Sequence, residues 1–184
     1  LHQAEAPATV EETPQARLER ALRSIDLFRP LSEDELQTAL RNFRHQHYAA
    51  GERILGEGEP GDSFCIVDRG TVEVSKALGG RPRVLAQLGD GQFFGEMALL
   101  TGEARSASVT ARTDVDLFTI DKAGFQQIVV ANPRITVDIS SILAARRDAL
   151  SQAEGEATQR FTGEGQAGDK QEHLLRRIRN YFGL

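Results

Sequence analysis

Residues 94–109 have the side-chain types and the spacing needed to bind an anion. The stretch reads FGEMALLTGEARSASV and combines Gly95, Glu96, a short apolar run, a second glycine and the pair Arg105-Ser106. A short helix that begins after a glycine presents unpaired backbone N–H groups at its first turn, and such groups favour anions. Arg105 adds a guanidinium and Ser106 a hydroxyl, while Glu96 supplies an acceptor for some other donor. We therefore predict an anion-binding loop with a carboxylate held nearby.

The overall composition narrows the classes of function. The formal net charge is −5, which argues against a nucleic-acid partner, because such proteins carry a basic face. Cys65 is the only cysteine, so no internal disulfide can form, and its apolar neighbours predict a small buried side chain. His45 and His47 share one face of an expected strand but lack a third metal ligand. The sequence offers no catalytic triad or carboxylate pair, so we expect no enzyme activity, no metal and no cofactor.

The N-terminal part reads as a linker followed by two helices. Residues 1–13 hold Ala, Glu, Thr and Pro without apolar periodicity, which is typical of a disordered or linker segment. Apolar residues at helical spacing begin after Pro14, and Ser32 followed by Glu35 is a capping-box signature. We therefore expect a first helix from Pro14 and a second helix over about 33–43.

The middle of the chain predicts a small antiparallel barrel or sandwich. Nine glycines between residues 51 and 91 separate short strand-like runs, and frequent turn signals of this kind are typical of all-β folds. The expected strands are residues 47–49, 53–55, 64–67, 71–75, 84–88, 107–111 and 115–120.

The C-terminal part predicts helices again. Asp121 is expected to cap a helix that Asn132-Pro133 ends, and a longer helix then runs from Pro133 to about Ala153. Residues 154–170 are rich in Gly, Gln, Glu and Thr and read as a flexible linker. Residues 171–184 form a short basic amphipathic tail helix in this interpretation.

The glycine-punctuated strands and the stretch FGEMALLTGEARSASV together resemble the cyclic nucleotide-binding domain family and its phosphate-binding cassette. The resemblance covers about residues 14–153, which we take as one domain. It implies an α+β fold, an eight-stranded antiparallel β-roll flanked by N-terminal helices and two C-terminal helices. It also implies that the ligand lies inside the roll and that the long helix acts as a lid.

The resemblance further implies a role for each cassette position. Arg105 would pair with the cyclic phosphate, with Ser106 beside it, and Glu96 would accept a hydrogen bond from the ribose 2′-OH. Gly95 would let the backbone approach the ribose. The remaining implied positions are the short-helix residues Met97, Ala98 and Leu99, the small Ala107, and Arg146 on the lid, with Arg147 as the alternative.

The expected ligand is cAMP, because Ser106 stands where cGMP-preferring relatives often carry Thr; cGMP stays open. The chain begins with Leu1, so we expect a piece of a longer protein. The cassette and tail resemble those of bacterial channels, which implies a cytoplasmic domain that gates the pore domain of a plasma-membrane parent, with homo-oligomers possible. Two alternatives remain: a stand-alone regulator with a protein partner, and the regulatory domain of an upstream enzyme.

Overall fold

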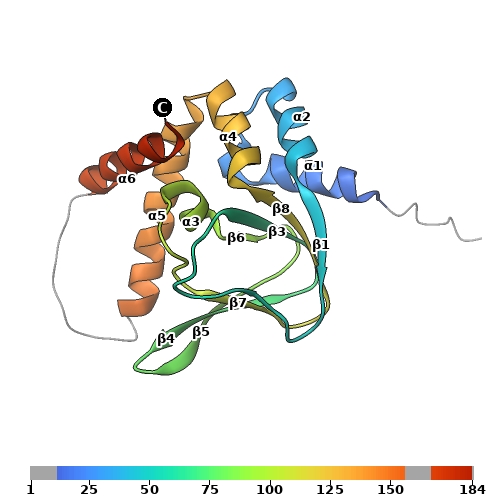
Figure 1. The fold of residues 1–184 in the computed structure, drawn as a ribbon, viewed down its shortest axis with the longest axis vertical. Helices are drawn as coiled ribbons and strands as arrows, with labels where there is room; N and C mark the ends of the chain where they lie inside the picture. The colour runs from blue at the N-terminus through green and yellow to red at the C-terminus, as the bar shows by residue number, and fades with distance from the viewer. Residues whose placement is uncertain (1–11, 156–166, 184) are drawn as a thin grey trace, which may run out of the picture.

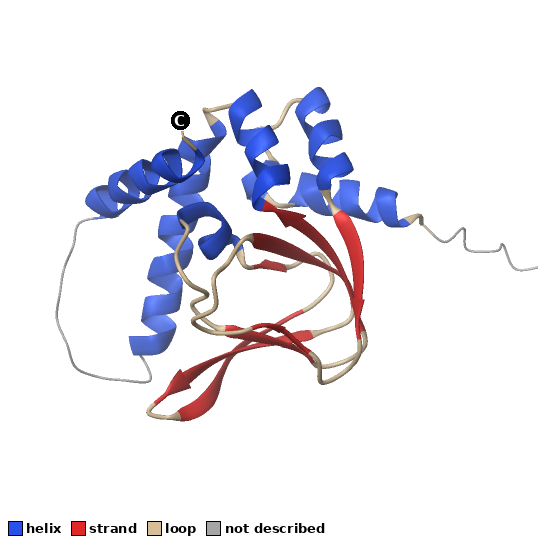
Figure 2. Cartoon of the chain, viewed as in Figure 1, coloured by secondary structure: helices blue, strands red, loops and turns tan. Residues whose placement is uncertain are grey.

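The computed structural model describes residues 12–155 and 167–183, apart from the side chains of Arg146 and of residues 149–155 and 167–170. Two N-terminal helices lead into a roll of strands, and further helices follow it (Figure 1). Figure 2 shows the helices gathered along the top and one side of the roll. None of the described helices is long and apolar enough to cross a membrane.

The roll consists of two four-stranded sheets in which every pairing is antiparallel. The first sheet has the order β1 (Arg44–Tyr48), β8 (Val115–Asp121), β3 (Ser63–Arg69) and β6 (Phe93–Phe94). The second has the order β2 (Arg53–Leu55), β7 (Ser108–Ala111), β4 (Val72–Leu78) and β5 (Arg81–Leu88). The predicted α+β fold with an eight-stranded antiparallel roll is therefore confirmed.

Two apolar cores hold the roll and the helices together. The smaller core lies inside the roll and is built from strand residues, including Cys65, which is 3% exposed, as predicted. Burial raises the pKa of the Cys65 thiol to about 11, because the charged thiolate is disfavoured away from water. The larger core joins the helices to the first sheet, and a group of phenylalanine rings lies within it: Phe28, Phe43, Phe64 and Phe125.

Local sequence signals set the helix starts. Helix α1 (Pro14–Ser24) begins after Thr13, whose side chain accepts from Ala16 N–H. The predicted capping box of Ser32 and Glu35 opens α2 (Glu33–Asn42). Asp121 caps α4 (Lys122–Ala131) by accepting from the Gly124 N–H, as the sequence predicts. These bonds satisfy backbone donors that a helix start otherwise leaves unpaired.

The bounds of the last two helices differ from those that the sequence predicts, which are residues 133 to about 153 and residues 171–184. Helix α5 (Ile135–Gly155) is preceded by a turn at Pro133, and α6 (Ala167–Phe182) begins four residues before the predicted position 171. The expected linker 154–170 therefore overlaps the ends of both helices, and its residues 156–166 lie outside the described residues. Of the expected N-terminal linker, residues 1–11 also lie outside them.

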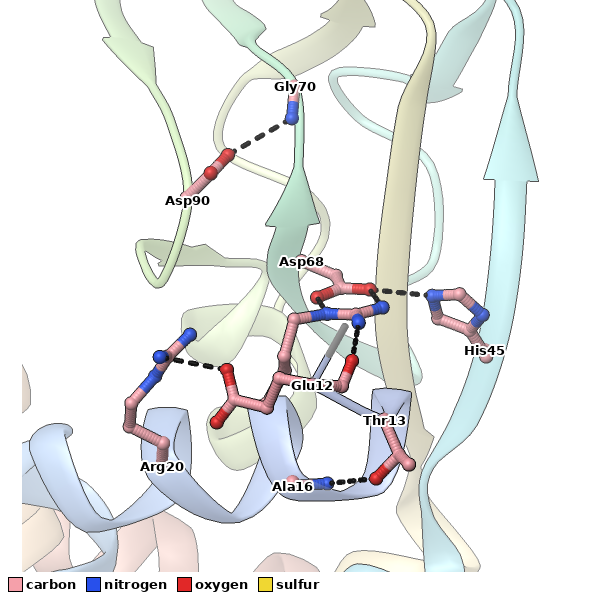
Figure 3. Close-up of polar contacts among 9 residues, drawn as sticks. Glu12, Thr13, Ala16, Arg20, His45, Asp68, Gly70 and Asp90 are labelled. Atoms are coloured by element: carbon pink, nitrogen blue, oxygen red, sulfur yellow. Dashed lines mark hydrogen bonds and ion pairs between the residues drawn. The ribbon is translucent and has the colours of Figure 1, made fainter. Parts of the chain in front are cut away.

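A buried carboxylate fastens α1 to the roll. Asp68 on β3 has only 1% of its side chain exposed, and it accepts from Arg17 Nε at 2.6 Å and Nη2 at 2.8 Å. Its Oδ2 also lies 2.9 Å from His45 Nε2, and Figure 3 shows the two side chains facing each other. Burial alone would raise the pKa of Asp68, but the hydrogen bonds from Arg17 and His45 outweigh burial and hold that pKa below its usual value.

Candidate functional site

A cavity of about 530 Å³ opens between the second sheet, the short helix α3 (Glu96–Thr101) and α5. Volumes of roughly 300–1,000 Å³ are typical of small-molecule sites. Of the nine residues that sequence analysis assigned to the site, seven line this cavity: Gly95, Glu96, Met97, Ala98, Arg105, Ser106 and Ala107. The fold thus brings the predicted residues together around one space.

Of the remaining two predicted residues, Leu99 lies in the apolar core, and the side chain of Arg146 is outside the part of the chain that the structure describes. Leu99 is fully buried in the larger apolar core, and its N–H donates to the Gly95 carbonyl at 3.3 Å. The side chain of Arg146 on α5 lies outside the described residues. Its neighbour Arg147, the alternative named from the sequence, lines the cavity.

Arg105 is the central charged group of the cavity. It is 6% exposed, and its guanidinium donates from Nη1 to the Ser63 carbonyl at 2.9 Å and to the Gly95 carbonyl at 3.0 Å. Nη2 donates to the Ser63 hydroxyl at 2.8 Å. Burial lowers the pKa of Arg105, because it removes water from the cation, but an arginine remains charged at neutral pH. These bonds fix the orientation of the guanidinium. All three acceptors are neutral oxygens.

Gly95 is required at its position for two reasons. Its φ of +87° lies in the left-handed region, which glycine adopts without strain. A Cβ there would lie 2.8 Å from the Ser63 carbonyl oxygen and 2.9 Å from Arg105 Nη1. A larger residue would therefore displace the groups that orient the guanidinium. Gly61 has a similar role, because a Cβ there would meet Ala98 and lie 2.9 Å from Arg105 Nε.

Glu96 is the first residue of α3 and is 5% exposed, although it borders the cavity. An acid in the first turn of a helix suits the positive end of the helix dipole. Its position one residue after Gly95 places a carboxylate and the Arg105 guanidinium on the same cavity wall. Such a wall can accept a hydrogen bond from a hydroxyl and donate hydrogen bonds to an anion within one ligand.

The cavity lining also includes residues that the sequence did not single out: Lys76 on β4, Leu85 and Ala86 on β5, and Glu103 just after α3. Arg147 on α5 lines the cavity with them. Arg147 Nη2 lies 3.2 Å from Glu103 Oε1. No local motif marks these positions, since they meet only through the pairing of β4 with β5 and the packing of α5.

One cluster outside the cavity groups possible metal ligands. His45, Asp68 and Asp116 each offer a ligand atom within 4.8 Å of the others. No third ligand for His45 could be recognised from the sequence, because the two acids come from the distant strands β3 and β8. Asp68 already accepts hydrogen bonds on both oxygens from Arg17 and His45, and Asp116 Oδ1 lies 2.9 Å from His47 Nδ1. These contacts make the cluster an ion-pair network between α1 and the first sheet.

Comparison with known proteins gives one family. Residues 45–132 match the family described as the cyclic nucleotide-binding domain. The chain is 36% identical over 125 residues to the cAMP-dependent protein kinase regulatory subunit of Dictyostelium discoideum. This match covers 67% of this chain and 38% of that protein. It is 37% identical over 130 residues to a cyclic nucleotide-gated potassium channel of Mesorhizobium japonicum. That match covers 71% of this chain and 35% of the channel.

A solved structure extends the similarity to the fold. The co-crystal structure of the regulatory domain of Toxoplasma gondii PKA with cAMP matches with a TM-score of 0.64 and 26% sequence identity. The match covers 88% of this chain and 57% of that one. The chain thus spans less than two fifths of the length of either of the two relatives named above.

Proposed function

We propose that this chain, which contains a cyclic nucleotide-binding domain, senses 3′,5′-cyclic AMP in the cavity at Arg105. The observation that carries the proposal is the buried Arg105 guanidinium, held by three hydrogen bonds to neutral acceptors on a cavity wall. A desolvated cation is unfavourable unless it meets an anion or strong acceptors. A cyclic phosphate in the cavity supplies that anion.

The geometry supports binding from two sides of one ligand. Charge-assisted hydrogen bonds from a guanidinium to a phosphate contribute roughly 1.5–3 kcal/mol each. Glu96 can accept a hydrogen bond from the ribose 2′-OH while Arg105 holds the phosphate, and Ser106 and Ala107 border the same cavity. The apolar residues of β4 and β5 then surround the purine. We favour adenine over guanine because Ser106 occupies the position after the arginine.

The proposed role is regulation rather than catalysis, since cyclic nucleotide-binding domains are regulatory domains. The nucleotide can act only by binding one arrangement of the helices more tightly than another. Helix α5 is the element placed to respond, because Arg147 borders the cavity. In this proposal Arg146 or Arg147 contacts the base from α5.

A second proposal concerns the protein or pore that the domain controls when nucleotide binds. Gating of a channel pore is supported by the similarity to the Mesorhizobium japonicum channel, at 37% identity. Regulation of a kinase partner is supported almost equally by the Dictyostelium discoideum regulatory subunit, at 36% identity. We therefore assign the sensing role shared by both, and keep the channel as the first candidate and a regulator of a partner protein or enzyme as the second.

Calorimetric titration tests the sensing role. Wild-type protein should bind cAMP, with weaker binding of cGMP and of 5′-AMP, which lacks the cyclic phosphate. Arg105→Gln should weaken cAMP binding about 100-fold or more, because two or more charge-assisted bonds are lost. Arg112→Gln is the matched control, since Arg112 is an exposed arginine that pairs with Glu73. Absence of saturable binding, or equal affinity of the Arg105→Gln and control proteins, contradicts the proposal.

A further inference from the structure

Helix α6 lies against the elements that bear the candidate site. It packs on α5 and on α3, as Figure 1 shows from its position across the upper end of α5. Leu174, Ile178 and Phe182 form its inner face and are no more than 3% exposed. This helix is therefore an integral part of the larger apolar core, and it contacts the short helix that carries Glu96.

Glu103 links α6 to the cavity. It follows α3, borders the cavity, and accepts hydrogen bonds from Arg147 on α5 and from Arg177 on α6. Its backbone N–H and one carboxylate oxygen also meet the Thr101 hydroxyl, at 3.3 and 3.2 Å. One carboxylate thus connects the cassette, the long helix and the last helix at the edge of the site.

A second contact fixes the same turn of the chain. Gly102 ends α3 with a φ of +69°, and a Cβ there would lie 2.7 Å from the ring of Tyr181 on α6. The Tyr181 ring in turn lies under Lys122, whose Nζ is 3.5 Å from the ring centroid, a cation–π contact. Helix α6 therefore holds residues 102–103 through packing as well as through charge.

We propose that α6 positions the cassette for nucleotide binding, with Arg177 as the positioning residue, and that bound nucleotide strengthens the docking of α6. This inference rests on the proposed function. Glu103 places a negative charge at the edge of a cavity meant for an anion, and Arg147 and Arg177 together turn the local charge from −1 to +1. Without Arg177 the local charge is zero and the turn after α3 is less restrained.

The reciprocal effect follows from thermodynamic linkage. If docked α6 raises nucleotide affinity by a given factor, bound nucleotide favours docked α6 by the same factor. Nucleotide binding then changes how firmly α6 is docked, and a partner that contacts the exposed face of α6 can respond to that change. Arg177 and Glu103 have 37% and 26% of their side chains exposed, so solvent screens the pair and the expected factor is modest.

The first test measures affinity. Arg177→Gln should weaken cAMP binding roughly three- to fivefold, as expected for a partly exposed ion pair, whereas Arg176→Gln, an exposed arginine one residue away on α6, should bind as wild type. Arg177→Lys should restore most of the affinity. The loss should shrink at 0.5 M salt and in a Glu103→Gln background, which a merely structural effect of the substitution would not produce.

The second test follows α6 itself by hydrogen exchange of residues 171–182. Saturating cAMP should slow exchange in wild type and less so in Arg177→Gln, and without nucleotide the variant should already exchange faster than Arg176→Gln. A wild-type protein that binds no nucleotide contradicts the proposed function itself. Normal wild-type binding, with equal affinities for the Arg177→Gln and Arg176→Gln proteins and α6 exchange unchanged by cAMP, overturns the role of α6 alone.

Discussion

Replacing Gly95 by alanine tests how the backbone orients the phosphate-binding group. Gly95 has a φ of +87°, and an added Cβ would lie 2.8 Å from the Ser63 carbonyl oxygen and 2.9 Å from Arg105 Nη1. Atoms this close must move apart. Gly51 provides a matched control, because its φ is +88° and an added Cβ there meets nothing within 4 Å. The two substitutions share backbone strain and differ only in the clash with the site.

The magnitudes follow from these contacts. Gly51→Ala should lower the free energy of unfolding by about 1–2 kcal/mol, the cost of a left-handed alanine. Gly95→Ala should lower it by about 1–3 kcal/mol more, because the close contacts force the site to shift. Displacing the guanidinium also breaks its bonds at 2.9 and 3.0 Å to the two carbonyls. Loss of one charge-assisted bond to the phosphate then reduces cAMP affinity about 10- to 100-fold.

Urea unfolding and calorimetry measure the two effects separately. Gly51→Ala should be destabilised but bind cAMP with wild-type affinity, whereas Gly95→Ala should lose both stability and affinity. If Gly95→Ala binds cAMP as tightly as Gly51→Ala, then the Gly95 contacts do not orient Arg105, and the reasoning is refuted.

Three further outcomes are expected. Glu96→Ala should reduce the preference for cAMP over 2′-deoxy-cAMP from about tenfold to near unity, because the side-chain acceptor is lost; an unchanged ratio from competition calorimetry would exclude the ribose role. Asp68→Asn should lower the free energy of unfolding by about 2–4 kcal/mol at pH 7, because Arg17 loses a buried partner, whereas Asp116→Asn should have a smaller effect. The folded-state pKa of Asp68 lies below its unfolded value of about 3.9. The difference in unfolding free energy between the wild type and Asp68→Asn should therefore be complete above about pH 5 and disappear as the pH falls through the folded-state pKa. A difference that does not change with pH would contradict the ion pair. The Cys65 thiol, with a pKa of about 11, should stay unreactive toward a disulfide reagent at pH 8 until the protein unfolds, so rapid native-state labelling would contradict its burial.

The site could be predicted from sequence where its residues are contiguous. Gly95, Glu96 and Arg105 lie within eleven residues, so short-range geometry and the family resemblance were enough to place them around one cavity. The sequence does not point to Ser63, although two of the three hydrogen bonds that Arg105 donates go to the Ser63 carbonyl and hydroxyl oxygens. It lies 42 residues away along the chain, and no local signal indicates that β3 begins beside the cassette.

The fold shows the same limit. Glycine spacing predicts a small antiparallel barrel or sandwich, and capping residues predict most helix starts, because turns and caps depend on neighbouring residues. The eight-stranded roll itself was implied by the family resemblance. The two-residue strand β6 was not predicted, since it exists only through its pairing with Cys65 and Ile66. Whether Arg146 or Arg147 faces the cavity depends on the rotation of α5 against the roll, which one helical sequence leaves open. The contact between Gly102 and Tyr181 likewise needs the packed structure.

The most direct measurement is the position of the nucleotide in a crystal structure of the chain grown with cAMP. The cyclic phosphate should lie within hydrogen-bond distance of the Arg105 guanidinium, with the ribose 2′-OH donating to Glu96 and the purine between β5 and α5. A well-ordered nucleotide whose phosphate lies away from Arg105 would contradict the central claim, as would a cavity left empty at cAMP concentrations that saturate the protein in solution.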